Sequence, residues 1–301
     1  LKKFSNSDLY SLVGSIFFLI TPIFIFRMNW HLAEAGQWLL LCTLYLAFFS
    51  KVDKARFFWI LLIILSVLIS YNFTTVILIV YSFLRIFNFF VKKESVFIPI
   101  KDFITIGALL LLTLYVIGYF EIRLLDALGV GYGIYKLNLV SIFDPINTIN
   151  NISWSWFLPD IRLSRGEELE GFNYLGLGQI AMLLFALVLF INKNNQTSLF
   201  SIKNNKAIKA FVIISLFITL WALSNKISLG PYTLLEIPLH KYIFGILSIT
   251  NKTGRTFWIV NYFLLILSLI IIYKCFSKKN SLLIIILFLI IQIADTSAGL
   301  K

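Results

Sequence analysis

Long apolar stretches separated by short polar segments run through almost the whole chain. An apolar helix of about 18 to 20 residues crosses the roughly 30 Å hydrocarbon core of a bilayer. The pattern predicts an all-α, polytopic membrane helix bundle of about nine transmembrane helices, forming a single domain over residues 1–301. The expected spans are 9–26, 34–50, 57–71, 74–91, 103–121, 174–192, 207–224, 256–273 and 281–295.

Composition supports a membrane environment. Hydrophobic residues make up 59% of the 301 residues and charged residues only 13%, which is more apolar surface than a soluble domain of this length can bury. The formal charge of +12 does not indicate nucleic acid, because the basic residues are scattered over the loops instead of gathering with aromatics on one surface. The expected partner is a lipid bilayer.

The distribution of Lys and Arg predicts the orientation. If the segment before the first span is cytoplasmic, most of these residues lie on cytoplasmic loops, as membrane insertion favours. Two long loops, about 122–173 and 225–255, then lie on the outer face, where function is expected. Arg85, inside a span, is expected to extend to the cytoplasmic surface. The Ile, Lys, Asn and Phe excess suits a bacterium, hence a multi-pass protein of the bacterial inner membrane.

Basic side chains near the outer membrane surface are the candidate ligand groups. Arg255 precedes a predicted helix that begins at 256, and Lys252 lies one turn earlier, so backbone N–H donors add to their charge. Arg27 and His31 are expected at the outer end of the first span, and Arg165 in the first long loop. Such groups bind phosphate, which predicts a lipid-linked phosphate substrate.

The stretch "ELEGFNYLGLG", residues 168–178, is expected to be the point where the first long loop re-enters the bilayer. Glu170 and Tyr174 are expected to face a groove for the lipid substrate. Alternatively, Glu170 only caps the following helix by accepting its free N–H groups. Three glycines are expected to permit close backbone approach, namely Gly171, Gly176 and Gly178.

Cofactors are left open by the sequence. A carboxylate such as Asp160 on the outer face can activate a sugar hydroxyl or hold a divalent cation. No CxxC motif or His/Cys cluster occurs, so no metal site is predicted.

Several stretches carry a resemblance to a known group of proteins. They are "GYGIYKLNLVSIFDP", "WFLPD", "GEELEGFNYLGLG", "LGPYTLLEIPL" and "NKTGRTFWIVNYFLL", within residues 20–295. They resemble a family of uncharacterised bacterial polytopic membrane proteins that is similar to the GT-C glycosyltransferases. The resemblance implies a polyprenyl-phosphate-linked sugar as donor and a catalytic acidic residue on the first outer loop. Because the chain begins at Leu1 without Met, further helices and the catalytic base are expected upstream, and an extension after residue 301.

The expected function is therefore transfer of a sugar from a polyprenyl-phosphate carrier at the outer face of the membrane. A transporter or flippase for a lipid-linked saccharide is an alternative. It would need charged residues inside the spans, and the expected spans 57–71 and 281–295 contain none apart from Asp295 at the outer end. A non-catalytic scaffold in envelope assembly is a third interpretation.

Overall fold

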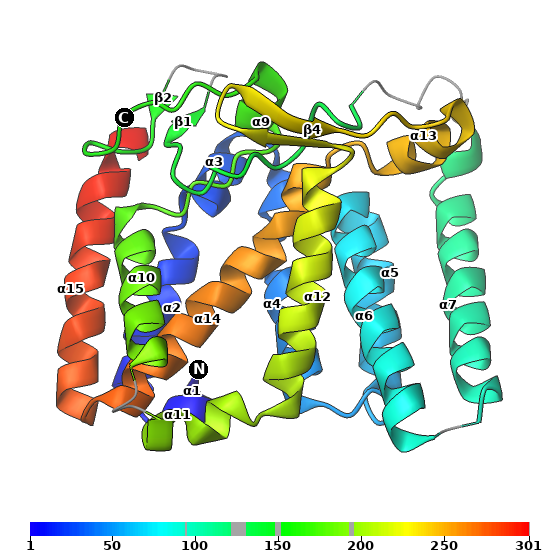
Figure 1. The fold of residues 1–301 in the computed structure, drawn as a ribbon. Coiled ribbons are helices and arrows are strands. Elements are labelled where there is room, and N and C mark those ends of the chain that lie inside the picture. Colours follow the sequence, from blue (N-terminus) through cyan, green and yellow to red (C-terminus); the bar gives the residue numbers. More distant parts are fainter. Residues whose placement is uncertain (94, 122–130, 148–151, 193–195, 301) are drawn as a thin grey trace.

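The structure is a computed structural model in which residues 1–93, 95–121, 131–147, 152–192 and 196–300 are described. Long helices stand side by side between two end faces (Figure 1). One end carries two β-hairpins and the short helices α9 (Arg165–Leu169) and α13 (Lys241–Leu247), and we call it the loop face. The helices α1 (Lys2–Ser5) and α11 (Gln196–Lys203) lie at the opposite end (Figure 1).

The remaining helices follow the apolar stretches of the sequence. The longer ones are α2 (Asp8–Leu19), α3 (Pro22–Trp30), α4 (Trp38–Phe49), α5 (Arg56–Ile69), α6 (Tyr71–Lys92), α7 (Phe97–Val116), α10 (Leu177–Ile191), α12 (Lys206–Leu223), α14 (Trp258–Cys275) and α15 (Lys278–Thr296). Short 3₁₀ helices are η1 (Leu32–Ala35), η2 (Tyr119–Glu121), η4 (Ser248–Thr250), η5 (Thr253–Phe257) and η6 (Ser297–Leu300).

Each of the nine predicted spans contains helix, but the count of nine transmembrane helices is not confirmed. In the described part of the chain, 6 helices are long and apolar enough to cross a membrane, or up to 7 if the bent pair α2 and α3 forms one span. The helices α5 and α10 are apolar but shorter. Several long apolar helices are the character of a multi-pass membrane protein in a lipid bilayer.

A break between α2 and α3 directs one candidate residue into the protein. The two helix axes differ by 50°, and Pro22 occupies the start of α3. Proline lacks the N–H that would continue the hydrogen bonds of α2, so a new helix direction begins there. Arg27, near the end of α3, is only 1% exposed as a result.

The predicted helical fold is confirmed in its main part, and the structure adds two small antiparallel hairpins on the loop face. In the first, β1 (Ile146–Asn147) pairs with β2 (Ile152–Ser153), and in the second β3 (Lys226–Leu229) pairs with β4 (Tyr232–Glu236). Leu229 faces Tyr232 across a turn in which Gly230 has a φ of 57°, a conformation that favours glycine. Both hairpins fall in the two predicted long loops.

The core centres on α14, which crosses the bundle diagonally (Figure 1). In the most apolar stretch of the span Thr253–Cys275, which contains α14, 78% is buried inside the protein. In the corresponding stretch of α7, at the edge of the bundle, only 17% is buried. A helix that is apolar on all sides is suited to burial among other helices. Because α14 continues η5, burial of α14 fixes the position of Arg255 at the loop face.

The expected close approach at two glycines of "ELEGFNYLGLG" is confirmed. Gly176 has a φ of 87° immediately before α10. A Cβ at Gly178 would lie only 2.6 Å from the backbone nitrogen of Gln292 in α15. The Gln292 side chain donates to Leu175 O (2.9 Å) and accepts from Gln179 N (2.9 Å), so a buried polar group inside the bundle is satisfied locally.

The expectation that Arg85 extends to the membrane surface is wrong. Its side chain is fully buried and pairs with Asp53 Oδ1 (2.6 Å) and Asp102 Oδ2 (3.0 Å). Arg56 also pairs with Asp102, at 2.9 Å. The two carboxylates hold Arg85 inside the protein. Their ion pairs connect α6 to α7, through Asp102, and to the segment before α5, through Asp53.

Replacing Gly178 by Ala tests the packing of α10 on α15. The added methyl group has no space, so we expect a loss of about 1–3 kcal/mol in stability, although Ala favours helix. Gly107→Ala in α7 is the control, because no atom lies within 4 Å of the Cβ position there. Apparent unfolding temperatures in detergent provide the measurement, and equal values for both variants would contradict the packing.

Candidate functional site

Five charged side chains meet at the loop face, and we call them the charge cluster. They are Arg27 of α3, Glu34 of η1, Glu170 at the end of α9, Lys252, and Arg255 of η5. They come from segments far apart in the sequence. Arg27, Glu34 and Arg255 are buried, whereas Glu170 and Lys252 are partly exposed.

Glu170 binds all three cations of the cluster. Its carboxylate accepts from Arg255 Nε (2.8 Å) and Nη2, and pairs with Arg27 Nη2 (3.1 Å) and Lys252 Nζ (3.2 Å). Burial raises the pKa of Glu170, but the charges of Arg255, Arg27 and Lys252 outweigh burial and lower the pKa to about 2. The carboxylate is therefore ionised throughout the physiological pH range.

Glu34 holds the other side of Arg255. Its Oε1 accepts from Arg255 Nη1, from Ser70 Oγ (2.9 Å) and from Asn72 Nδ2 (2.9 Å). Its Oε2 is buried and has no hydrogen-bond partner in the structure. A buried carboxylate oxygen without a hydrogen-bond partner is energetically costly.

Two glycines bring Glu170 and Arg255 together. Gly171 follows Glu170, Gly254 precedes Arg255, and a Cβ on Gly254 would lie 2.7 Å from the Cα of Gly171. Asn173 Nδ2 donates to both carbonyl groups, at 2.8 Å for Gly171 O and 3.1 Å for Gly254 O. The close approach expected of Gly171 is thus confirmed, and its partner is the glycine of the "GRTFW" stretch.

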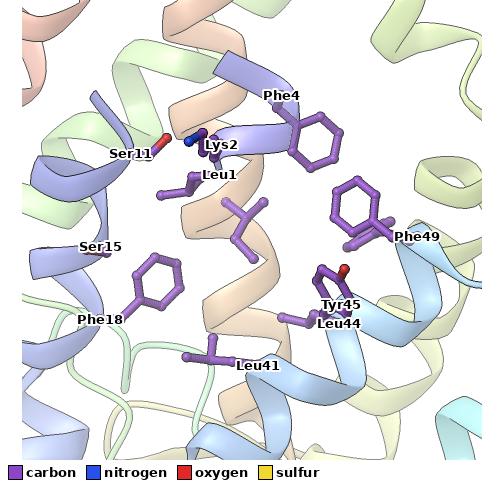
Figure 2. Close-up of a pocket in the computed structure, with 12 residues that line it drawn as sticks. Leu1, Lys2, Phe4, Ser11, Ser15, Phe18, Leu41, Leu44, Tyr45 and Phe49 are labelled. Carbon is purple, nitrogen blue, oxygen red and sulfur yellow. The ribbon is translucent and has the colours of Figure 1, made fainter. Parts of the chain in front are cut away.

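An open pocket of about 460 Å³ lies beside the cluster. Its lining comes from two segments and consists of Asn29, Trp30, His31, Leu32, Ala33, Glu34, Lys252 and Arg255. His31 is exposed, and burial together with the charges of Arg27 and Arg255 lowers its pKa, which favours the neutral imidazole. A second cavity, of about 280 Å³ between α1, α2, α4 and α14 (Figure 2), has a mainly apolar lining and contains no residue of the charge cluster.

The cluster has a formal charge of +1, because three cations face two carboxylates. Guanidinium and ammonium groups in such an arrangement recognise phosphate and carboxylate. Among the residues that the structure describes, no group of three or more His, Cys, Asp or Glu side chains is arranged to hold a metal ion. That the cluster binds an anion stays a prediction.

The structure brings together five of the eight predicted site residues: Arg255, Lys252, Arg27, His31 and Glu170. Their role as ligand groups stays a prediction. Asp160 is exposed and has no contact with the cluster among the described interactions. Arg165 begins α9, but its side chain lies outside the described part of the structure.

Tyr174 does not face the charge cluster. It is fully buried and donates to Asp295 Oδ2, which also accepts from the Leu177 backbone N–H at 2.9 Å. Asp295 therefore caps α10, so the alternative of Glu170 as the cap of this helix is wrong. The long-range packing of α15 beside the start of α10 supplies the capping carboxylate.

Sequence reasoning missed the partners of Glu34 and a second ion pair. Ser70 and Asn72 stand at the short break between two apolar stretches, and this position is the signal that could have identified them. Lys136 and Glu167 form a buried pair under the loop face. Nothing in their local sequence predicts their pairing, because they are 31 residues apart.

The comparisons with known proteins identify a family. The profile of a family described as "Domain of unknown function (DUF6311)" matches residues 1–297, and the chain belongs to this family. A search of the curated proteins found no match, and a search of the solved structures found none.

Glu170→Gln tests the electrostatics of the cluster. Loss of one carboxylate from a buried ion-pair group is expected to destabilise the protein by about 3 kcal/mol at neutral pH. A lowered folded-state pKa stabilises the protein above the unfolded-state value of 4.5, and this contribution is lost as the pH falls toward about 2. The difference in apparent unfolding temperature between wild type and Glu170→Gln should thus be constant above about pH 5 and shrink in acid.

The matched control is Glu236→Gln on β4. Glu236 pairs with Lys226 at 3.3 Å, but its side chain is 59% exposed, so the change should have little effect at any pH. The assigned ion pairs would be contradicted if the difference in apparent unfolding temperature between wild type and Glu170→Gln stayed the same from neutral pH to about pH 3.

Proposed function

We propose that this member of the DUF6311 family is a membrane glycosyltransferase of GT-C type. Its donor is a sugar linked to a polyprenyl phosphate, and transfer takes place at the outer face of the bacterial inner membrane. The observation that carries the proposal is the convergence of Arg27, Lys252 and Arg255 on a single carboxylate beside an open pocket. Glu170 stands where an anionic ligand would bind.

The position of the cluster suits a lipid-linked phosphate. Arg255 lies immediately before α14, and Arg27 lies near the end of α3, so both cations sit where apolar helices end at the loop face. A lipid whose chain occupies the bilayer presents its phosphate at this level. The exposed side chains of Trp30 and Leu32 line the same pocket and provide an apolar edge.

The charge of the cluster suits a phosphodiester. A sugar phosphodiester carries one negative charge, which matches the one net positive charge of the cluster with Glu170 in place. During transfer, the acceptor hydroxyl gives its proton to a general base, its oxygen bonds to the anomeric carbon, and the bond from that carbon to the phosphate oxygen breaks. The departing polyprenyl phosphate gains negative charge, and Arg255 and Lys252 stabilise that charge more strongly than the charge of the bound donor.

A flippase for the same lipid-linked sugar is less well supported. It needs a polar path through the bundle. In the described helices, the buried Gln179, Asn261 and Gln292 lie in contacts between α10, α14, α15 and the segment before α10. The cavity between α1, α2, α4 and α14 (Figure 2) and the cavity between α4 and α5 are both lined mainly by apolar side chains.

Arg255 variants test the proposal by binding. Polyprenyl phosphate is titrated into the protein in lipid nanodiscs, with phosphatidylglycerol present in excess as competitor. Arg255→Ala should weaken binding by about 1–3 kcal/mol, roughly fivefold to 150-fold, and Arg255→Lys should restore only part of it. Lysine cannot reproduce the two-sided contact with Glu34 and Glu170.

Lys241→Ala is the control for loss of a cation on the same face, because Lys241 is exposed at the start of α13 and lines neither polar pocket of that face. It should bind polyprenyl phosphate as the wild type does. Full binding by Arg255→Lys, or complementation of a deletion strain by Arg255→Ala at normal protein level, would show that Arg255 is not a phosphate ligand and only pairs with Glu34 and Glu170.

A further inference from the structure

A second polar pocket lies on the loop face, apart from the charge cluster. It has a volume of about 250 Å³, at the small end of ligand sites, and lies between the start of α9, the segment 133–136 and the hairpin of β3 and β4. The polar side chains that line it are Lys136, Ser164, Glu167, Lys226, Ser228 and Thr233. Two glycines and Ile134 complete most of the remaining wall.

A buried ion pair forms the floor of this pocket. Lys136 and Glu167 are 1% and 2% exposed, and their side chains are in direct contact. Lys136 Nζ also donates to Ser228 Oγ (2.7 Å), and Glu167 Oε2 accepts from Asn138 Nδ2 (3.0 Å). Burying such a pair opposes folding unless its hydrogen bonds are well made, and here both partners are held from several sides.

The charges of the pocket cancel. Lys136 pairs with Glu167, and at the rim Lys226 pairs with Glu236. The pocket therefore lacks the net positive charge of the charge cluster and has no preference for an anion. Its lining supplies donors from lysine, an acceptor from the carboxylate, and hydroxyl groups of Ser164, Ser228 and Thr233 that do both. Such a lining matches the hydroxyl groups of a neutral ligand.

The pocket is connected to the charge cluster through the backbone of Lys136. A Cβ on Gly254 would lie 2.9 Å from the Lys136 carbonyl carbon and 3.0 Å from its oxygen, and one on Gly171 would also meet this carbonyl group. Glu167 and Glu170 stand one turn apart at α9. The pocket wall thus shares the Lys136 backbone with the junction that holds Glu170 and Arg255.

We propose that this pocket binds the acceptor of the transfer reaction, a neutral saccharide. The inference rests on the proposed function, which requires a second, hydroxyl-bearing substrate near the donor phosphate. Lys136 and Glu167 orient its hydroxyl groups, and Thr233 and Ser164 contact it at the rim.

Cysteine protection tests this assignment. Thr233→Cys places a thiol on the pocket wall, and Leu234→Cys, the next residue of β4, is the matched control, because Leu234 is 58% exposed and does not line the pocket. Both are made with Cys42 and Cys275 replaced by Ser. A membrane-impermeant maleimide is the reagent, and glucose, N-acetylglucosamine, mannose and maltose are the probes, with inorganic phosphate as the anion control.

At least one sugar should slow labelling of Thr233→Cys about threefold or more at twice its Kd, because the protection factor is 1 + [L]/Kd. Leu234→Cys should react at an unchanged rate, and phosphate should protect neither. The assignment is overturned if none of these sugars protects Thr233→Cys, if Leu234→Cys is protected equally, or if phosphate protects Thr233→Cys.

Polyprenyl phosphate binding by the same proteins separates the two proposals. Binding without sugar protection overturns the acceptor pocket and leaves the donor site standing. Sugar protection without polyprenyl phosphate binding overturns the proposed transferase and, with it, the acceptor role of the pocket. Retention of polyprenyl phosphate binding by Thr233→Cys also shows that the variant is folded.

Discussion

The contact between the backbones of Gly171 and Gly254 is the constraint on which the loop face depends. Gly254 belongs to η5, whose continuation α14 is buried in the bundle, and Gly171 ends the segment that leaves α9. A side chain at Gly254 would push the two segments apart, and one at Gly171 would collide with the Lys136 carbonyl group. Glu170 and Arg255 would then lose the ion pair that joins the first long loop to the helices. The same contact includes the Lys136 carbonyl group, so one backbone junction positions both pockets.

The sequence predicts those parts of the structure that depend on local pattern. Apolar stretches locate the helices, and the position of Arg255 before an apolar stretch places it at a helix start. Tyr174 could not be placed in this way, because its partner Asp295 lies 121 residues away and meets it only after α15 packs on α10. The buried position of Arg85 could not be predicted for a related reason, because its carboxylate partners Asp53 and Asp102 lie on other segments.

Local sequence pattern explains only in part why five of the predicted site residues come together. Charged groups at the ends of apolar helices cannot enter the bilayer, so they gather at the same level. Which of them meet is decided by packing, here by the bend at Pro22, which directs Arg27 inward, and by the two glycines. Arg162 is also basic and belongs to the first long loop, yet it is exposed, because no such packing feature brings it to the cluster.

The ion pairs that hold α9 in place limit how a ligand can bind at the charge cluster. Glu167 holds α9 to Lys136, and Glu170, one turn later, holds it to Arg255 and Arg27. If a phosphate replaced the Glu170 carboxylate, the contacts of Glu167 would still fix α9, so the change would be confined to the side chain of Glu170 and its neighbours. If the phosphate instead joined Lys252 at the open side, Glu170 would stay in place and the net charge would become neutral. The second arrangement avoids exposing a carboxylate that three cations stabilise, and a monoanionic phosphodiester is the ligand that satisfies it.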